Sequence, residues 1–195
     1  MHGLINRSIQ SFICDTYGRG VWLDVSEGAK LDFDSFEAMM IYDDALTDAV
    51  LGAAVERLSK PRSDVLEDLG TYLVSHPTTD AARRLLRFGG ETYEEFLHSL
   101  DDLHDRVKLA MPELDFPRLE LRDHAPGVFS LSCRWPYEGF GHVVVGLLRG
   151  MADDYGALVV LEFQSARPGE EVISIQLLDI SHATGSPFSL ASGGR

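Results

Sequence analysis

The chain has 195 residues, of which 45% are apolar and 25% charged, and its 31 acidic and 17 basic residues give a formal net charge of −14. This length suits one domain or two small subdomains that share a core, and the apolar fraction excludes wholesale disorder. The negative charge argues against a nucleic-acid partner, because phosphate affinity rests on clustered Lys and Arg, and against docking on an anionic membrane surface.

Cysteines and targeting segments point to an ordinary reduced protein. Cys14 and Cys133 form no C-x-x-C pair, so the sequence shows neither a zinc site nor a disulfide framework. The N-terminus lacks the apolar core of a signal peptide, and no run of about 18 apolar residues occurs. We therefore expect a cytoplasmic protein without a membrane partner.

The first part of the chain has apolar residues at helical spacing. A loop is expected over 26–35, after the first helix. Four helices are expected before residue 90, each followed by Gly or Pro: residues 4–17, 43–60, 63–76 and 80–88. Asp43 or Asp44 suits the start of the second and Ser63 that of the third.

The best-marked helix follows, because Thr92 and Glu95 match a capping box. Steps of four, four, three and four residues place His104 within its apolar stripe: Phe96, Leu100, His104, Val107, Met111. An imidazole that faces a core needs a partner for its nitrogens, which a backbone carbonyl, a carboxylate or a metal can supply. No second ligand lies three or four residues further on, so a metal would have one protein ligand here, as heme iron does. A satisfied core histidine and a heme ligand both remain open.

After Pro117 the pattern changes to a period of two. Strands are expected over 118–122, 128–135, 157–164 and 172–179, with a helix over 143–155 between the two pairs. The order is a helical N-terminal part followed by β-β-α-β-β, which is an α+β fold with an antiparallel sheet. Ser130, Ser132 and Arg134 share one face of a strand, where a Ser–Arg pair suits a carboxylate ligand, although a solvated arginine gives the same pattern.

The sequence resembles the heme–nitric oxide/oxygen binding (H-NOX) family, which includes the sensor domain of soluble guanylate cyclase. Seven motifs in order carry the resemblance: Met1-x-Gly3-Leu4-Ile5-Asn6, Tyr42-Asp43-Asp44, Phe96-Leu97, Leu100-Asp101-Asp102-Leu103-His104, Pro117, Ser132-x-Arg134 and Val143-Val144-Val145-Gly146-Leu147. It implies one domain over 1–182 that binds heme b between a distal helical part (about 1–60) and a proximal part (61–182). A flexible tail is expected over 183–195.

The resemblance also assigns roles to residues. It implies that His104 is the proximal iron ligand and that Pro117 presses on the porphyrin. Further heme contacts are implied for the propionate-binding residues Ser132 and Arg134, the distal-pocket residues Ile5, Val143 and Leu147, and also Leu100 and Met1. The family's clamp has a tyrosine where this chain has Ser130, and Tyr137 is the residue that could compensate.

The resemblance further implies a function. Oxygen-binding members carry a distal tyrosine at the position of Val143, so an apolar pocket favours nitric oxide, and also carbon monoxide, over oxygen. We expect a bacterial-type, stand-alone sensor without enzymatic activity. Its expected partner is a separate signalling enzyme, such as a histidine kinase or a cyclic-di-GMP enzyme. Two alternatives are a heme-free interaction module of the same fold, which Ser130 favours, and an enzyme, against which the pocket lacks a convergent acid, base or nucleophile.

Overall fold

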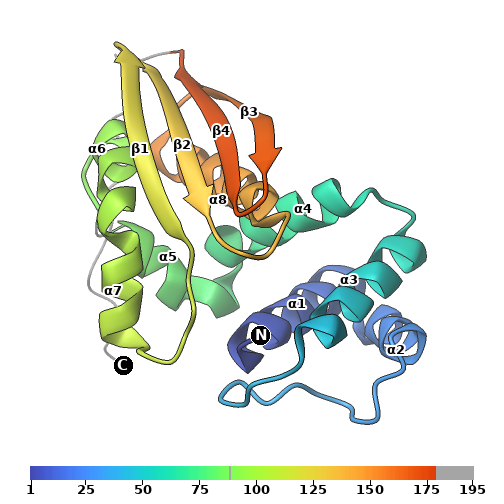
Figure 1. The fold of residues 1–195 in the computed structure, drawn as a ribbon. Helices are drawn as coiled ribbons and strands as arrows, with labels where there is room; N and C mark the ends of the chain where they lie inside the picture. The colour runs from blue at the N-terminus through green and yellow to red at the C-terminus, as the bar shows by residue number, and fades with distance from the viewer. Residues whose placement is uncertain (88, 179–195) are drawn as a thin grey trace, which may run out of the picture.

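The computed structural model describes residues 1–87 and 89–178. Helices make up the N-terminal part of the chain and pack beside the part that contains the sheet (Figure 1). The helices are α1 (Gly3–Tyr17), α2 (Arg19–Gly28), α3 (Asp44–Leu58), α4 (Arg62–Ser75), α5 (Asp80–Arg87), α6 (Tyr93–His98), α7 (Leu103–Ala110) and α8 (Phe140–Tyr155), with 3-10 turns η1 (Pro77–Thr79) and η2 (Ser99–Asp102). None of these helices is both long and apolar enough to cross a membrane. The expected tail over 183–195 lies outside the described residues.

The four strands form one antiparallel sheet in the order β1-β2-β4-β3. They are β1 (Arg118–Ala125), β2 (Val128–Arg134), β3 (Val159–Arg167) and β4 (Glu170–Leu177). Helix α8 follows β2 and precedes β3, so the chain has the expected β-β-α-β-β order. The α+β fold class is thereby confirmed.

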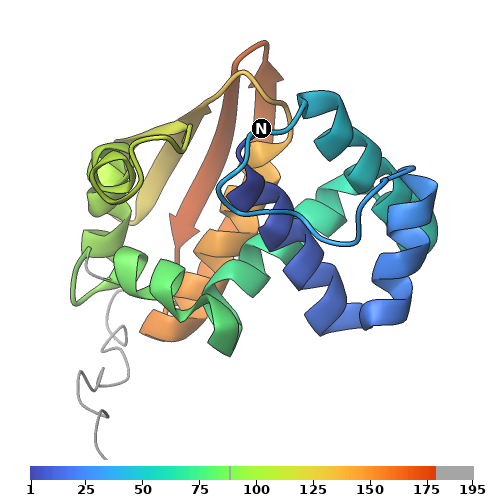
Figure 2. The ribbon, with the colours of Figure 1, turned by 90° about the horizontal axis from the view of Figure 1, so that it is seen from below.

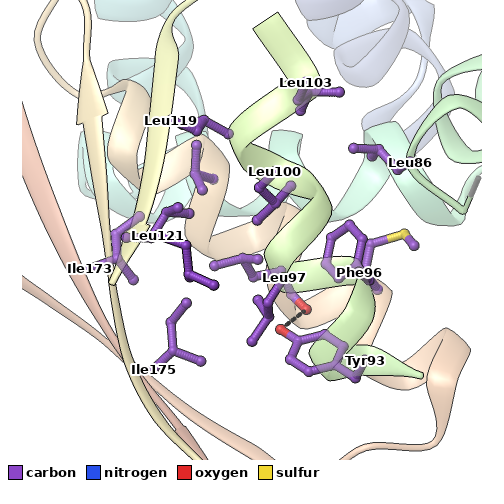
Figure 3. Close-up of a cluster of buried hydrophobic side chains, with 14 of the residues drawn as sticks. Leu86, Tyr93, Phe96, Leu97, Leu100, Leu103, Leu119, Leu121, Ile173 and Ile175 are labelled. Carbon is purple, nitrogen blue, oxygen red and sulfur yellow. Dashed lines mark hydrogen bonds between the residues drawn. The ribbon is translucent and has the colours of Figure 1, made fainter. Parts of the chain in front are cut away.

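The larger core lies between the sheet, α8 and the helices before β1. Figure 3 shows Phe96, Leu97 and Leu100 from α6 and η2 opposite Leu121 and the β4 side chains of this cluster. Burial of such side chains stabilises the fold by about 1.5–3 kcal/mol each. The helix that carries the expected heme ligand is therefore anchored to the sheet by its preceding turns.

A smaller core joins the N-terminal helices to α4, and the crossing of α4 with α8 connects the two cores. Gly70 of α4 lies against the backbone of Val143, and Gly146 of α8 lies against the backbone of Glu67. A Cβ atom at either glycine would overlap these atoms, so the close crossing requires glycine on both helices.

Three expectations about helices were wrong in detail. Helix α2 occupies 19–28, so the loop expected over 26–35 begins only after it. This helix was missed because it is short and buries only Trp22 and Val25. Helix α4 begins at Arg62 with Pro61 at its N-cap, and Ser63 lies inside it.

The third difference concerns the helix expected after Thr92. The capping box of Thr92 and Glu95 is present, but η2 separates α6 from α7. The Asp101 carboxylate accepts a hydrogen bond from the Leu121 backbone at 2.7 Å, which ties this turn to β1. A 3-10 helix has three residues per turn, so the buried face passes through Leu103 and Val107. His104 is therefore half-buried beside this face.

Candidate functional site

A cavity of about 1640 Å³ lies between the two cores. Its wall combines side chains of α1 and α4 with side chains of α7 and α8, and most of them are apolar. Pockets for small molecules usually have volumes of about 300–1,000 Å³, so this one has room for a large, mainly apolar ligand.

Five of the site residues expected from the resemblance line this cavity: Met1, Ile5, Leu100, Val143 and Leu147. Val143 and Leu147 lie one turn apart on α8, and Ile5 projects from the first turns of α1. Gly70 and Gly146 bring α4 and α8 together beside them. Residues distant in sequence thus form one apolar wall.

His104 has a defined partner next to the cavity. Its Nδ1 atom lies 2.7 Å from the carbonyl oxygen of Phe116. A proton on Nδ1 is donated to this carbonyl, which leaves the lone pair on Nε2 for another ligand, as in many metal-binding histidines. His104 itself does not line the cavity, but its neighbours Leu103, Val107 and Phe116 do. Pro117 follows Phe116 and is buried, also outside the cavity lining.

Ser132 and Arg134 do not line the cavity. In β2, Leu131 and Cys133 face the core, so alternation turns Ser132 and Arg134 to the opposite face of the sheet. The guanidinium of Arg134 lies 3.0 Å from carboxylate oxygens of both Glu120 and Glu170. In this structure Arg134 therefore holds side chains of neighbouring strands.

Residues just after β2 reach the cavity instead. Trp135 and Tyr137 line it, and the Trp135 indole donates to Asp115 Oδ2 at 3.3 Å. The Tyr137 hydroxyl donates to Asp44 Oδ2 at 2.8 Å. The amino group of Met1 lies 2.5 Å from Asp44 Oδ1; this bond and the one from Tyr137 lower the pKa of the Asp44 carboxyl. The sequence hinted at Tyr137 only as a substitute within the clamp, not as a partner of Asp44.

A second hydroxyl in the wall is also occupied. Tyr72 lines the cavity and donates to Asp15 Oδ2 at 2.6 Å. Burial, and next this hydrogen bond, raise the pKa of Tyr72 to about 12, so the phenol stays protonated at neutral pH. Neither phenol in the wall is therefore an uncommitted donor.

Glu171 was missed by the sequence reasoning. Its buried carboxylate accepts hydrogen bonds from the backbone of Gly139 at 2.7 Å and Gly141 at 2.5 Å. A carboxylate at a helix N-terminus satisfies free N–H groups and complements the helix dipole. Glu171 thus fixes the first turn of α8, which leads into Val143.

Among curated proteins, the chain is similar in sequence to soluble guanylate cyclases. It is 27% identical over 182 residues to "Soluble guanylate cyclase gcy-31" of Caenorhabditis elegans, covering 93% of this chain and 24% of that protein. It is 22% identical over 193 residues to "Soluble guanylate cyclase 89Da" of Drosophila melanogaster, covering 99% of this chain and 28% of that protein. The chain spans about a quarter of the length of these relatives.

Solved structures of H-NOX proteins share the fold. A mutant of an H-NOX protein from S. oneidensis in the Fe(II) ligation state superposes with a TM-score of 0.79 at 17% identity, over 94% of this chain and 99% of that one. The unliganded Fe(II) form of an H-NOX mutant from K. algicida superposes with a TM-score of 0.76 at 16% identity, over 93% of this chain and 98% of that one. The family model described as Haem-NO-binding matches residues 2–163. The chain therefore belongs to the haem-NO-binding (H-NOX) family of heme-based gas sensors.

Proposed function

We propose that this domain holds heme b in the cavity, with His104 as the iron ligand, and senses nitric oxide on behalf of a separate signalling protein. The observation that supports this most is that the Nδ1 atom of His104 is hydrogen-bonded to the Phe116 carbonyl beside a large apolar cavity. One of the similar S. oneidensis structures is described as being in the Fe(II)NO ligation state.

The residues fit most parts of this cofactor. The apolar wall would suit the porphyrin faces, and an imidazole whose Nδ1 is held by a backbone carbonyl would suit an iron ligand. The expected carboxylate clamp does not fit as well, because the Arg134 guanidinium is paired with Glu120 and Glu170 in this structure. We therefore propose the cavity and His104 as the binding determinants.

Heme would supply an iron centre that binds a diatomic gas. Ile5, Val143 and Leu147 exclude water from their side of the cavity and contribute no hydrogen-bond donor. The nearby His142 is already engaged, with its Nδ1 3.3 Å from Glu67 and its ring stacked on Phe163. Oxygen sensing draws on a donor in the wall, whereas nitric oxide and carbon monoxide depend on one far less. The wall therefore favours these two gases.

Signalling requires that the gas prefers one conformation of the domain over another. His104 contacts Phe116, which leads through Pro117 into β1, and η2 is tied to β1 by Asp101. A displacement of α7 is thus passed to the sheet. From the resemblance, the receiver is a histidine kinase or a cyclic-di-GMP enzyme.

Absorption spectra of the purified, reduced protein test the proposal. We expect a Soret band that shifts with nitric oxide and with carbon monoxide but not with air. His104→Ala should abolish the spectrum of the histidine-ligated iron. His98→Ala is the matched control, since His98 lies on α6 and is about half exposed. An unchanged spectrum in His104→Ala would contradict the assignment of His104 as the iron ligand.

A heme-free interaction module is the second candidate, and the position of Arg134 favours it. This function predicts a protein without a Soret band even after hemin is added. Turnover of a small molecule that depends on His104 would instead indicate an enzyme.

A further inference from the structure

The segment between α2 and α3 exposes three consecutive large apolar side chains. Met39, Met40 and Ile41 are 77%, 53% and 66% exposed. Single exposed apolar residues are ordinary, whereas contiguous ones usually mark interaction sites. We call these three residues the Met39–Ile41 surface.

Buried aromatic packing and a hydrogen bond to α1 hold this segment in place. Phe36 is fully buried, and its ring packs at 5.0 Å centroid distance against both Phe33 and Tyr42. The Phe36 carbonyl also accepts a hydrogen bond from Arg7 of α1 at 2.9 Å. The aromatic side chains of the segment thus pack inward, while the Met39–Ile41 surface faces solvent.

The surroundings of this surface are acidic. Residues 29–44 contain five acidic residues and one lysine. Four of the acidic side chains are exposed and form no ion pair with any residue that the structure describes: Asp32, Asp34, Glu37 and Asp43. An apolar centre with a polar, solvent-accessible rim is the usual composition of a protein interface.

The same segment contacts the start of α1, as Figures 1 and 2 show. The backbone N–H of Gly3 donates to the carbonyl oxygen of Met40 at 2.7 Å, and the backbone N–H of Tyr42 donates to that of Met1 at 2.9 Å. A Cβ atom on Gly3 would overlap the backbone of Met40. Ile5, in the next turn of α1, lines the cavity. A movement of this end of α1 therefore displaces the Met39–Ile41 surface directly.

We propose that the Met39–Ile41 surface docks a separate protein chain that presents Lys or Arg side chains next to apolar ones. Methionine side chains adapt to different apolar partners, and the carboxylates without an ion pair select for positive charge. A second copy of this chain suits the surface poorly, because it would bring the same acidic rim and a formal net charge of −14. The role of the docked chain as signalling partner rests on the proposed function, whereas docking itself does not.

Fluorescence anisotropy with a labelled amphipathic Lys/Leu peptide tests the docking, with a Glu/Leu peptide of the same apolar face as charge control. We expect the whole protein to bind only the Lys/Leu peptide. The double variant Met39→Ser/Met40→Ser should weaken binding at least about tenfold, which corresponds to about 1.4 kcal/mol. The variant Asp34→Asn/Glu37→Gln should weaken it and reduce its salt dependence.

Leu109→Ser is the matched control, since Leu109 is 85% exposed on α7, away from this segment. Equal affinity of wild type and Met39→Ser/Met40→Ser overturns the proposal, as does an equal loss in Leu109→Ser. Dimerisation in sedimentation experiments that is lost in Met39→Ser/Met40→Ser would assign the surface to a second copy instead.

Peptide binding is measured with and without heme and nitric oxide. If the wild-type protein binds the peptide but takes up no heme, the proposed gas sensing is overturned and the docking stands. A Kd that nitric oxide shifts severalfold supports the signalling role, and an unchanged Kd in the gas-bound protein refutes that role.

Discussion

The imidazole Nδ1 of His104 is hydrogen-bonded to the backbone carbonyl oxygen of Phe116 at 2.7 Å, although the two residues are 12 positions apart in the sequence. The bond fixes the tautomer of the ring and its orientation relative to α7 and to the approach to β1. Because the acceptor belongs to the backbone, it persists when the Phe116 side chain changes. The residue that the resemblance assigns to iron thus has a partner that leaves Nε2 available.

His104→Gly should retain the fold, because His104 is only half-buried. We expect its spectrum to lack the histidine-ligated iron and to regain it when free imidazole is added at millimolar concentration. His98→Gly, with the same imidazole, should behave like wild type. If imidazole restores nothing while the variant still binds heme, a different residue holds the iron.

Val143→Tyr should allow stable oxygen binding. Val143 is buried in the apolar cavity wall, and tyrosine would add a hydroxyl donor there. Val143→Phe is the matched control, because it adds the same ring without the hydroxyl. We expect a shift of the Soret band in air for Val143→Tyr alone. A shift in both variants would attribute the change to bulk rather than to hydrogen bonding.

Local signals in the sequence predicted local structure well. Asp43 is the N-cap of α3, and Thr92 forms its capping box, because caps depend on residues within one turn. The alternation of apolar residues also predicted that two strands precede α8 along the chain and two follow it. These features need no information about distant parts of the chain.

Contacts between distant residues could not be predicted in this way. Tyr137 and Asp44 are 93 residues apart, and Glu171 reaches Gly141 across 30 residues. The break at η2 occurs where Leu121 donates a hydrogen bond to Asp101, and it moves His104 off the buried stripe. Periodicity alone assumes a continuous helix and therefore misplaces His104 relative to the core.

Arg134→Ala tests where the carboxylates of heme are bound. Since Arg134 pairs with Glu120 and Glu170 and does not line the cavity, we expect the rate of heme transfer to apomyoglobin to stay within about twofold of wild type. The comparison variant is Tyr137→Phe, which changes a residue of the cavity wall. A large acceleration in Arg134→Ala would show that this arginine reorients toward bound heme.

Gly146→Ala should destabilise the domain. Its Cβ would overlap the backbone of Glu67, which cannot move as a flexible side chain can. Overpacking of this kind costs about 1–3 kcal/mol. Gly52→Ala in α3 is the control, because nothing lies near its Cβ, and it should stabilise by about 0.5–1 kcal/mol. Urea unfolding of both variants measures the difference, and equal stabilities would contradict the close crossing of α4 and α8.

The pH dependence of stability should include Asp44. Its pKa is lowered in the folded protein, chiefly by the amino group of Met1 and then by Tyr137. A carboxyl whose folded pKa lies below its unfolded value of about 3.9 stabilises the fold above that pH. This stabilisation is lost as the pH falls below about 4 and through the folded pKa. We therefore expect Asp44→Asn to be less stable than wild type at pH 6 and to lose less stability between pH 6 and pH 3.

Asp32→Asn provides the control for this measurement, because Asp32 is exposed and forms no ion pair with the part of the chain that is described. Urea midpoints at both pH values should be the same for Asp32→Asn and wild type. Parallel pH profiles for Asp44→Asn and wild type would show that the Asp44 bonds to Met1 and Tyr137 contribute nothing to folding. The hydrogen bond from Tyr137 joins the start of α3 to the segment after β2. Asparagine is an uncharged and therefore weaker acceptor, so Asp44→Asn should also loosen this side of the cavity. Faster heme loss from Asp44→Asn at pH 6 would follow from that loosening.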